Sequence, residues 1–331
     1  MNIKSLLLGS AAALLAVSGA RAADAVVVAE PEPMEYVRIC DVYGAGFYYI
    51  PGTETCLKIG GLVRYQINWT DNDDGWKKKT TARLKLDARS ETEYGTFKRY
   101  IEVEFANQTS YDSTAVKLRY AYFELGGLMV GRNDTLFDGD LSGEFDSAGG
   151  DFINSVRYTF DAGNGIAVSA ALEEADTNYD YTPNVAGKVS IAQGWGGVDL
   201  FAAYDATAEE AALKAIASFK ATDALTLQAM AIYNSGNSFY GIGYEWSVGG
   251  YAKYQVNEKL AVGAGGQYFG DRFEDSNPLT TVAGNSDWTI GAVVDYKIVD
   301  NLNAKLAVNY VDGDSYADGS FNGFLRLDAS F

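Results

Sequence analysis

The amino-acid sequence predicts an all-β protein, a 16-stranded antiparallel transmembrane β-barrel. Three observations lead to this prediction. Apolar and polar side chains alternate along strand-like segments, short turns alternate with longer loops between the segments, and the last segment ends at Phe331. A period of two puts apolar side chains on one face of a strand and polar side chains on the other. Tight turns on one side of a membrane and loops on the other are typical of an up-and-down barrel.

The N-terminal region predicts export from the cytoplasm. Lys4 precedes an apolar run at residues 6–17, and an A-x-A site ends at Ala22. Together these features indicate a cleaved secretory signal peptide at residues 1–22. Beyond it no stretch of about 18 apolar residues occurs, so we expect no transmembrane helix.

Residues 23–56 are expected to form an N-terminal lead-in to the barrel, which we place at residues 57–331. Cys40 and Cys56 lie in the exported part of the chain, where a disulfide is the default state of two cysteines. Closing a loop of this length contributes about 3 kcal/mol in the chain-entropy model. We therefore expect a structural disulfide and no catalytic or metal-binding role for the cysteines.

The composition excludes several classes of function. The net charge is −18 at pH 7, and it becomes more negative when the signal peptide is removed with its two basic residues, Lys4 and Arg21. Such a charge disfavours nucleic acid as a partner. Histidine is absent, so Ser-His and Cys-His catalytic pairs cannot form. We expect no enzyme, no cofactor and no metal site.

The strand-like segments follow one another along the chain. The first has apolar side chains or glycine at every second position from Leu57 to Trp69. The polar faces of the first four segments carry a group of basic side chains, which we call the basic group: Arg64, Arg83, Lys85, Arg89, Lys98, Lys117 and Arg119.

Residues 210–220 have a helix-like composition, but their neighbours need a pairing partner, so we expect a strand there. All five prolines fall outside the expected strands, as the missing ladder donor requires. The expected strands are 57–69, 80–90, 95–106, 115–125, 128–132, 152–160, 164–173, 184–193, 196–205, 210–220, 224–234, 247–256, 259–270, 286–299, 302–311 and 320–331.

A soluble β-sandwich and a membrane barrel both show such alternation, and three features favour the barrel. The polar positions carry too many charges for a small packed interior, whereas a barrel of about 16 strands encloses an aqueous channel instead of a packed core. The last strand alternates up to Phe331, which resembles the assembly signal of bacterial outer-membrane barrels. Aromatic side chains lie near strand ends, as in interfacial girdles: Tyr65, Trp69, Trp195, Tyr204, Tyr233, Trp246, Tyr254, Trp288 and Tyr310.

The longest interruption of the strand pattern is the loop at residues 132–151. Arg132 is its single basic residue, and its acidic residues are Asp134, Asp138, Asp140, Glu144, Asp146 and Asp151. Its glycines permit tight turns, and Phe137 and Phe145 offer apolar anchors. A long ordered loop in a compact domain is usually functional. We interpret it as the third loop of the barrel, folded into the lumen, where it sets the size and charge of a pore. The alternative is a solvated acidic surface loop.

Residues 37–64 read VRICDVYGAGFYYIPGTETCLKIGGLVR, which resembles the opening signature of the alphaproteobacterial porins of Brucella and rhizobia, and most of all the Brucella porins. The similarity continues through LRYAYFEL at 118–125 to the terminal strand. The resemblance implies a homotrimer in the bacterial outer membrane for passive diffusion of small hydrophilic solutes. Its expected partners are outer-membrane lipid, lipopolysaccharide and the barrel assembly machinery. The segment LMVGR at 128–132 departs from family members with more residues there, and the chain is on the short side.

We expect the constriction of the pore between the acidic loop and the basic group. Adjacent strands lie about 4.8 Å apart, so the basic side chains can form one cluster. Opposed charges across a narrow wet gap produce a transverse field that orients dipolar solutes. The excess of acidic groups predicts a weak cation preference. The alternatives are a solute-specific channel, for example for a sugar, and a soluble secreted sugar-binding β-protein.

Overall fold

The structure is a computed structural model that describes residues 38–108, 114–174, 181–274, 281–282 and 284–331. The chain divides into two compact units, residues 1–38 and 39–331. The predicted signal peptide and nearly all of the first unit lie outside the described residues.

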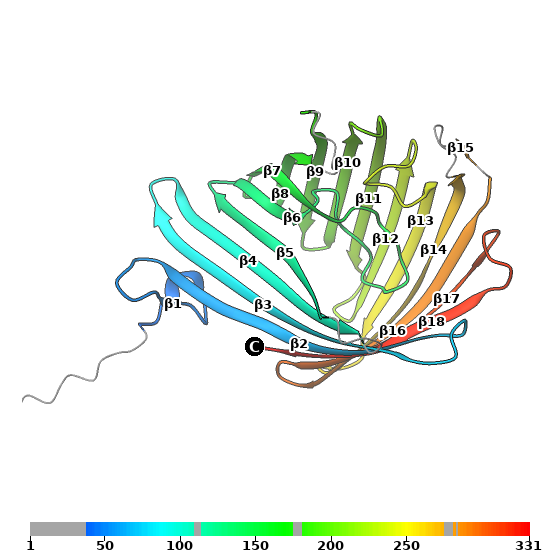
Figure 1. Cartoon of the computed structure of the whole chain (residues 1–331), viewed down its shortest axis with the longest axis horizontal. Helices are drawn as coiled ribbons and strands as arrows, with labels where there is room; N and C mark the ends of the chain where they lie inside the picture. The colour runs from blue at the N-terminus through cyan, green and yellow to red at the C-terminus, as the bar shows by residue number, and fades with distance from the viewer. Residues whose placement is uncertain (1–37, 109–113, 175–180, 275–280, 283) are drawn as a thin grey trace, which may run out of the picture. The chain divides into compact units, whose positions relative to one another are not determined.

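The second unit consists mainly of antiparallel strands (Figure 1). Among the described residues there is one short 3-10 helix, η1 (Asp41–Tyr43), and no helix long and apolar enough to span a membrane. Two strands have only two residues, β1 (Tyr48–Tyr49) and β15 (Thr281–Val282). The long strands are β2 (Cys56–Thr70), β3 (Lys77–Thr92), β4 (Gly95–Gln108), β5 (Thr114–Leu125), β6 (Leu128–Asp134), β7 (Phe152–Asp161), β8 (Ile166–Glu174), β9 (Asn184–Gln193), β10 (Gly196–Asp205), β11 (Glu210–Lys220), β12 (Leu225–Asn234), β13 (Tyr244–Gln255), β14 (Leu260–Glu274), β16 (Asp287–Val299), β17 (Leu302–Gly313) and β18 (Ser320–Ser330).

The long strands pair with their neighbours in sequence, and the two ends of the series meet. β18 pairs with β2, with Leu325 opposite Ile67, and β14 pairs directly with β16. The sixteen long strands in the described part of the chain therefore form one closed sheet, the predicted 16-stranded antiparallel barrel. Closure removes the unpaired strand edges that a membrane does not tolerate.

The predicted strands are confirmed, with some differences at their ends. Residues 210–220 form β11, because β10 and β12 supply backbone partners on both of its edges and pairing overrides a weak helix propensity. β6 continues through Arg132 to Asp134, since these residues pair with β7. The long loop therefore begins at Thr135 and not at residue 132.

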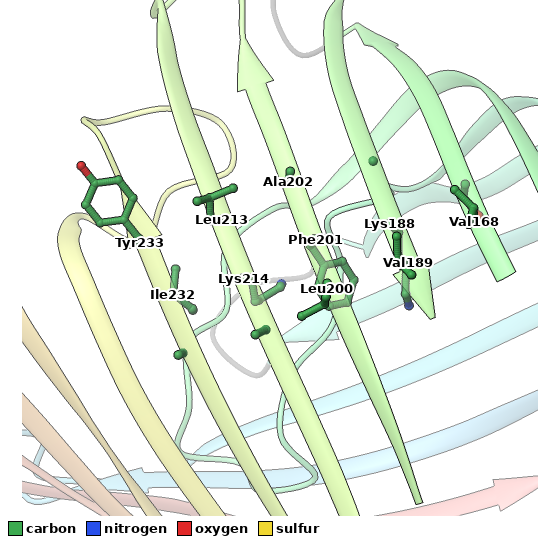
Figure 2. Close-up of a pocket in the computed structure, with 14 residues that line it drawn as sticks. Val168, Lys188, Val189, Leu200, Phe201, Ala202, Leu213, Lys214, Ile232 and Tyr233 are labelled. Atoms are coloured by element: carbon green, nitrogen blue, oxygen red, sulfur yellow. The ribbon is translucent and has the colours of Figure 1, made fainter. Parts of the chain in front are cut away.

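The outer face of the barrel wall is apolar, whereas the inner face is mixed and largely polar. On β10, Leu200 is 47% exposed and the next residue, Phe201, is 4% exposed. On β11, Leu213 is 51% exposed and Lys214 is 3% exposed. Figure 2 shows both side chains on this strand. Large exposed apolar side chains recur in this way on strands around the barrel. A wall of this kind suits lipid on the outside and water on the inside.

The principal apolar core lies inside the barrel. It forms where residues 135–151, which we call the inner loop, pack against the wall. Phe137 and Leu141 of the inner loop are buried in one cluster with wall residues such as Phe201 and Ile216. Figure 1 shows the segment between β6 and β7 crossing the inside of the sheet. The loop is thus folded into the lumen as predicted, and it is not a solvated surface loop.

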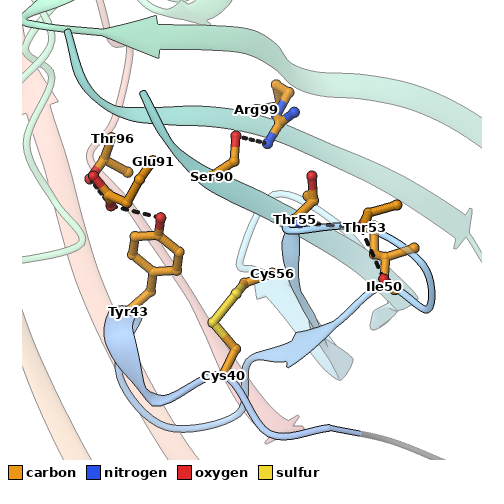
Figure 3. Close-up of a disulfide and its surroundings, with 10 residues drawn as sticks. All are labelled: Cys40, Tyr43, Ile50, Thr53, Thr55, Cys56, Ser90, Glu91, Thr96 and Arg99. Atoms are coloured by element: carbon orange, nitrogen blue, oxygen red, sulfur yellow. Dashed lines mark hydrogen bonds between the residues drawn. A yellow bond between two sulfur atoms is a disulfide. The ribbon is translucent and has the colours of Figure 1, made fainter. Parts of the chain in front are cut away.

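The segment before β2 is attached to the barrel by the predicted disulfide. Cys40 and Cys56 are bonded (Figure 3), and they form a buried cluster with Phe47. The hydroxyl of Tyr43 donates a hydrogen bond to Glu91 of β3 at 2.7 Å. The end of the lead-in is therefore held covalently by β2 and through a side chain by β3.

Candidate channel constriction

The first arm of the inner loop is held by Glu173 of β8. The carboxylate of Glu173 accepts a hydrogen bond from Thr135 Oγ1 at 2.6 Å and another from the Leu136 amide at 2.7 Å. The Thr135 amide donates to the Asp151 carbonyl at 3.1 Å, which closes the base of the loop. Hydrogen bonds to an ionised group are roughly twice as strong as neutral ones, so this arm is firmly anchored.

The middle of the inner loop is held by Lys214 of β11. Its ammonium group donates to the Gly139 carbonyl at 2.8 Å and to the Ala148 carbonyl at 3.0 Å, so one side chain ties two arms of the loop together. The same nitrogen lies 4.4 Å from the centre of the Phe137 ring. A buried cation needs such partners, so the position of Lys214 and the conformation of the loop depend on each other.

The far end of the inner loop is held by the last two strands. Glu144 Oε1 accepts hydrogen bonds from Lys305 Nζ of β17 at 2.8 Å and from Arg326 Nη1 of β18 at 3.2 Å. Its backbone carbonyl accepts a third from Asn309 Nδ2 at 2.9 Å. The loop thus spans the lumen from β8 to the strands that close the barrel.

The apolar anchor Phe145 occupies a notch in the wall. A Cβ atom on Gly291 would lie 2.8 Å from Phe145 Cβ, so glycine makes room for the ring. The ring centre of Tyr251 lies 6.1 Å from that of Phe145. Beside this contact, Gln267 donates to the Ser147 carbonyl and accepts from the Ser147 amide, both at 2.8 Å. Packing and hydrogen bonding therefore hold this part of the loop together.

The predicted acidic residues of the constriction fall into two sets. Asp138 and Asp140 are exposed on the inner loop and form no ion pair with any described residue. The other four have partners, and those of Glu144 are described above. Three carboxylates accept hydrogen bonds at 2.7 Å: Asp134 from the Tyr120 hydroxyl, Asp146 from the Leu141 amide and Asp151 from the Phe152 amide. Asp134 is the last residue of β6, so it belongs to the wall.

Asp138 and Asp140 lie in surroundings that disfavour their charge. Desolvation inside the bore raises the pKa of both carboxyl groups above the usual value for aspartate. Neighbouring carboxylates raise the pKa further, Asp134 acting on Asp138 and Asp146 acting on Asp140, while the Lys214 ammonium opposes the shift. The two carboxylates are therefore a concentrated negative charge that is sensitive to pH.

Most of the basic group pairs with carboxylates of the wall itself. Arg83 Nε donates to Glu104 at 2.6 Å, and Arg119 Nε donates to Glu102 at 3.0 Å. Lys85 Nζ lies 3.7 Å from Glu102. Both glutamates are buried on β4. Three cations thus share two carboxylates.

The four other members of the basic group also have partners. Arg64 forms two hydrogen bonds with Asp328, at 2.6 and 2.8 Å, and Arg89 forms two with Asp87, at 2.9 and 2.7 Å. Lys98 donates to the Tyr122 hydroxyl at 3.0 Å, and Lys117 lies 4.6 Å from the centre of the Phe152 ring. Among the described residues, no member of the basic group forms an ion pair with the inner loop. The assignment of these side chains to the constriction therefore stays a prediction.

Sequence reasoning missed the side chains that hold the inner loop. Lys214, Lys305 and Arg326 contact it directly, and Glu102 and Glu104 bind the arginines of the basic group. Each of them alternates with apolar neighbours on its strand, which is the signal that identified the basic group. The same signal could have shown that they face the lumen, but not which partner each one meets.

The inner loop and the basic group lie on different parts of the wall. The side chains that hold the loop come mainly from β8, β11, β14, β17 and β18. The basic group comes from β2 to β5, where a hollow of about 430 Å³ is lined by Arg83, Lys98 and Tyr122, among others. Dissolved molecules that pass through the bore therefore meet a loop with two carboxylates that lack an ion pair within the described part of the chain, and a wall with paired cations.

Comparison with known proteins identifies the family. Residues 24–325 match the model of the porin subfamily. The chain is 36% identical to the porin Omp2b of Brucella suis and 37% identical to Omp2b of Brucella canis, each over 379 aligned positions that cover 100% of both chains.

Solved structures show the same fold at lower sequence identity. The outer membrane channel DcaP of Acinetobacter baumannii aligns with a TM-score of 0.70 and 17% identity over 86% of this chain and 99% of its own. The trimer form of OmpT, an outer membrane protein of Vibrio cholerae, aligns with a TM-score of 0.61 and 13% identity over 84% and 100%. The family match overturns the alternative of a soluble secreted sugar-binding β-protein. The chain belongs to the porin subfamily, and it is an outer-membrane β-barrel porin, a channel and not an enzyme.

Proposed function

We propose that the chain forms a water-filled channel for passive diffusion of small hydrophilic solutes and ions, with a weak preference for cations. The observation that carries this proposal is the pair of exposed inner-loop carboxylates, Asp138 and Asp140, which have no ion-pair partner among the described residues. Fixed negative charge in a narrow aqueous passage raises the local concentration of cations and lowers that of anions.

The preference for cations is weak because the basic group keeps some positive charge. Arg83, Arg119 and Lys85 share only two carboxylates. We assign the two walls of the constriction to the acidic residues of the loop region and to the basic group. The field between them orients dipolar solutes, and dissolved salt reduces it over a Debye length of about 10 Å at 0.1 M.

We further propose that the porin is a homotrimer. The family resemblance supports this proposal, and the trimer form of Vibrio cholerae OmpT shares the fold. The apolar outer wall would contact outer-membrane lipid and lipopolysaccharide. Phe331 follows β18 directly, and its side chain is exposed, which suits a residue that the barrel assembly machinery reads.

The test is a recording of the purified protein in a planar bilayer under a salt gradient. We expect stable conductance in steps of three and a reversal potential that indicates modest cation selectivity. The double variant Asp138→Asn/Asp140→Asn should move the reversal potential towards zero. A matched control, Asp223→Asn/Asp300→Asn, removes the same charge from exposed short turns and should leave it unchanged.

Two results would contradict the proposal. Folded, inserted protein without conductance would exclude a diffusion channel. An equal shift of the reversal potential in both double variants would mean that overall charge, and not the inner loop, sets the selectivity.

A solute-specific channel is the second candidate, and one observation favours it. The ring of Tyr100 lies 6.0 Å from that of Tyr120 and 5.5 Å from that of Tyr122, centre to centre, beside the hollow in the basic wall. Aromatic faces of this kind can stack on the apolar side of a sugar ring. A saturable reduction of the ion current by a sugar, lost in Tyr100→Ala, would favour this candidate over general diffusion.

A further inference from the structure

A second loop lies against the inner loop inside the barrel. Residues 235–243 join β12 to β13, and Tyr240 at their centre is fully buried. The Tyr240 ring packs edge-on against Phe137 of the inner loop, with 5.6 Å between ring centres. Beside Tyr240, the Phe239 amide donates to the Asp205 carboxylate at 2.8 Å, which holds the second loop to β10.

Tyr240 also reaches the carboxylate that anchors the inner loop. Its hydroxyl donates to Glu173 Oε2 at 2.9 Å, on the same oxygen that accepts from Thr135. Glu173 is 1% exposed, so nearly all of its hydrogen-bonding capacity must be met by protein. Burial and the Glu173 carboxylate raise the pKa of Tyr240, so its hydroxyl keeps its proton and remains a donor.

The other arm of the inner loop meets the same tyrosine. Gly149 has φ +75°, and a Cβ atom there would lie 2.2 Å from the Tyr240 carbonyl oxygen. The backbones are therefore in contact at a position where only glycine fits. Both arms of the inner loop thus rest on Tyr240, one through Glu173 and Phe137 and the other through Gly149.

We infer that Tyr240 is a positioning residue of the channel, through which the 235–243 loop locks the inner loop in its conducting position. The inference rests on the proposed constriction by the inner loop. Without the Tyr240 hydroxyl, Glu173 loses one of the three hydrogen-bond donors that it has among the described residues. The carboxylate stays buried, and its hydrogen bonds to Thr135 and Leu136 weaken. The inner loop then moves more often, and each movement changes the ion current.

The test compares two tyrosine-to-phenylalanine variants in single-channel recordings. Tyr240→Phe removes one oxygen atom and keeps the ring contact. Tyr251→Phe is the matched control, because Tyr251 is also buried and also packs on the inner loop, at Phe145, but its hydroxyl has no hydrogen-bond partner among the described residues. We expect Tyr240→Phe to increase the rate of brief closures roughly tenfold, the effect of one lost hydrogen bond to a buried charge. We expect Tyr251→Phe to behave as the unaltered protein.

A second variant tests the hydrogen bonding to Glu173 from the inner loop. Thr135→Val removes the other side-chain donor of Glu173 with little change of shape, and it should produce the same closures even if Tyr240→Phe does not fold. Steady current in either folded variant would overturn the inference, and so would equal closures in Tyr251→Phe. The reversal potential of Asp138→Asn/Asp140→Asn is a separate readout. The inference about Tyr240 can therefore fail while the proposed cation selectivity still holds.

Discussion

Phe331 and Gly61 exchange two backbone hydrogen bonds across the seam of the barrel. The Gly61 amide donates to the Phe331 carbonyl at 3.0 Å, and the Phe331 amide donates to the Gly61 carbonyl at 3.1 Å. A Cβ atom on Gly61 would lie 2.7 Å from Phe331 Cζ and 2.1 Å from the Arg83 carbonyl oxygen. The terminal ring therefore lies over a glycine of the first long strand, where the sheet closes.

The first prediction concerns this seam. Gly61→Val should destabilise the folded barrel by about 1–3 kcal/mol, because the added methyl groups displace the terminal ring or the neighbouring backbone. The measurement is the temperature at which the compact, fast-migrating form on a denaturing gel is lost. Gly194→Ala is the control, since a Cβ atom there meets no atom of the described residues within 4 Å. Equal stability of the two variants would mean that the seam tolerates a side chain at residue 61.

The second prediction concerns the disulfide. Cys40→Ser/Cys56→Ser should lower the free energy of unfolding by about 3 kcal/mol, because the unfolded chain regains the entropy of a closed loop. Denaturant unfolding in detergent, followed by tyrosine and tryptophan fluorescence, measures the change. A reductant should destabilise the unaltered protein and have no effect on the variant. If reduction affects neither protein, the bond does not contribute to stability.

The third prediction concerns Lys214. Lys214→Met should increase the preference for cations, because it removes a positive charge that acts on both Asp138 and Asp140 and frees the carbonyls of Gly139 and Ala148. The reversal potential under a salt gradient measures the change, and the current should also become noisier. Lys220→Met, at the exposed end of β11, is the control of equal charge. A shift of the same size in the control would exclude a local effect.

The fourth prediction is a pH dependence of selectivity. Asp138 and Asp140 are ionised above their raised pKa values, and the cation preference is then fully present. As the pH falls through these values, the carboxyl groups take up protons and the cation preference declines. The midpoint of this decline should lie above the pKa of an ordinary aspartate, which is about 3.9. Reversal potentials measured across a pH series give the midpoint. The Asp138→Asn/Asp140→Asn variant should lack this step, and a step that persists there belongs to other groups.

The raised pKa values of Asp138 and Asp140 also affect the stability of the folded protein. A carboxyl group whose pKa is higher in the folded than in the unfolded state binds protons more tightly when folded, so its ionisation at neutral pH opposes folding. Protonation below the raised pKa removes this cost. Asp138→Asn/Asp140→Asn should therefore be at least as stable as the unaltered protein at neutral pH.

Local patterns in the sequence were sufficient for much of the fold. The alternation from Leu57 to Trp69 predicts β2, because every second side chain of a strand points to the same face regardless of its partner strand. The glycines and phenylalanines of residues 132–151 likewise marked a loop that could turn tightly and anchor itself. These inferences need only the chain's own periodicity and the properties of neighbouring residues.

Local sequence patterns could not predict which charged side chains pair with each other. Glu144 meets Arg326 only because β18 closes on β2 and the inner loop reaches the last strands, and the two residues are separated by 182 positions in the chain. Arg83 faces Glu104 because the register of β3 on β4 sets them opposite each other. A shift of one residue would have separated them.

The sequence by itself thus determined a β-barrel with an acidic loop and an apolar outer face, because these depend on period, composition and local turns. The resemblance at residues 37–64 implied the porin family, and the exported location of the two cysteines predicted the disulfide. Only the tertiary structure decided that Glu144 is paired while Asp138 and Asp140 form no ion pair with a described residue, and that Tyr240 lies against the inner loop and Glu173. The physical reason is that strand register and inward folding of loops bring together side chains from distant segments, and no local pattern records those contacts.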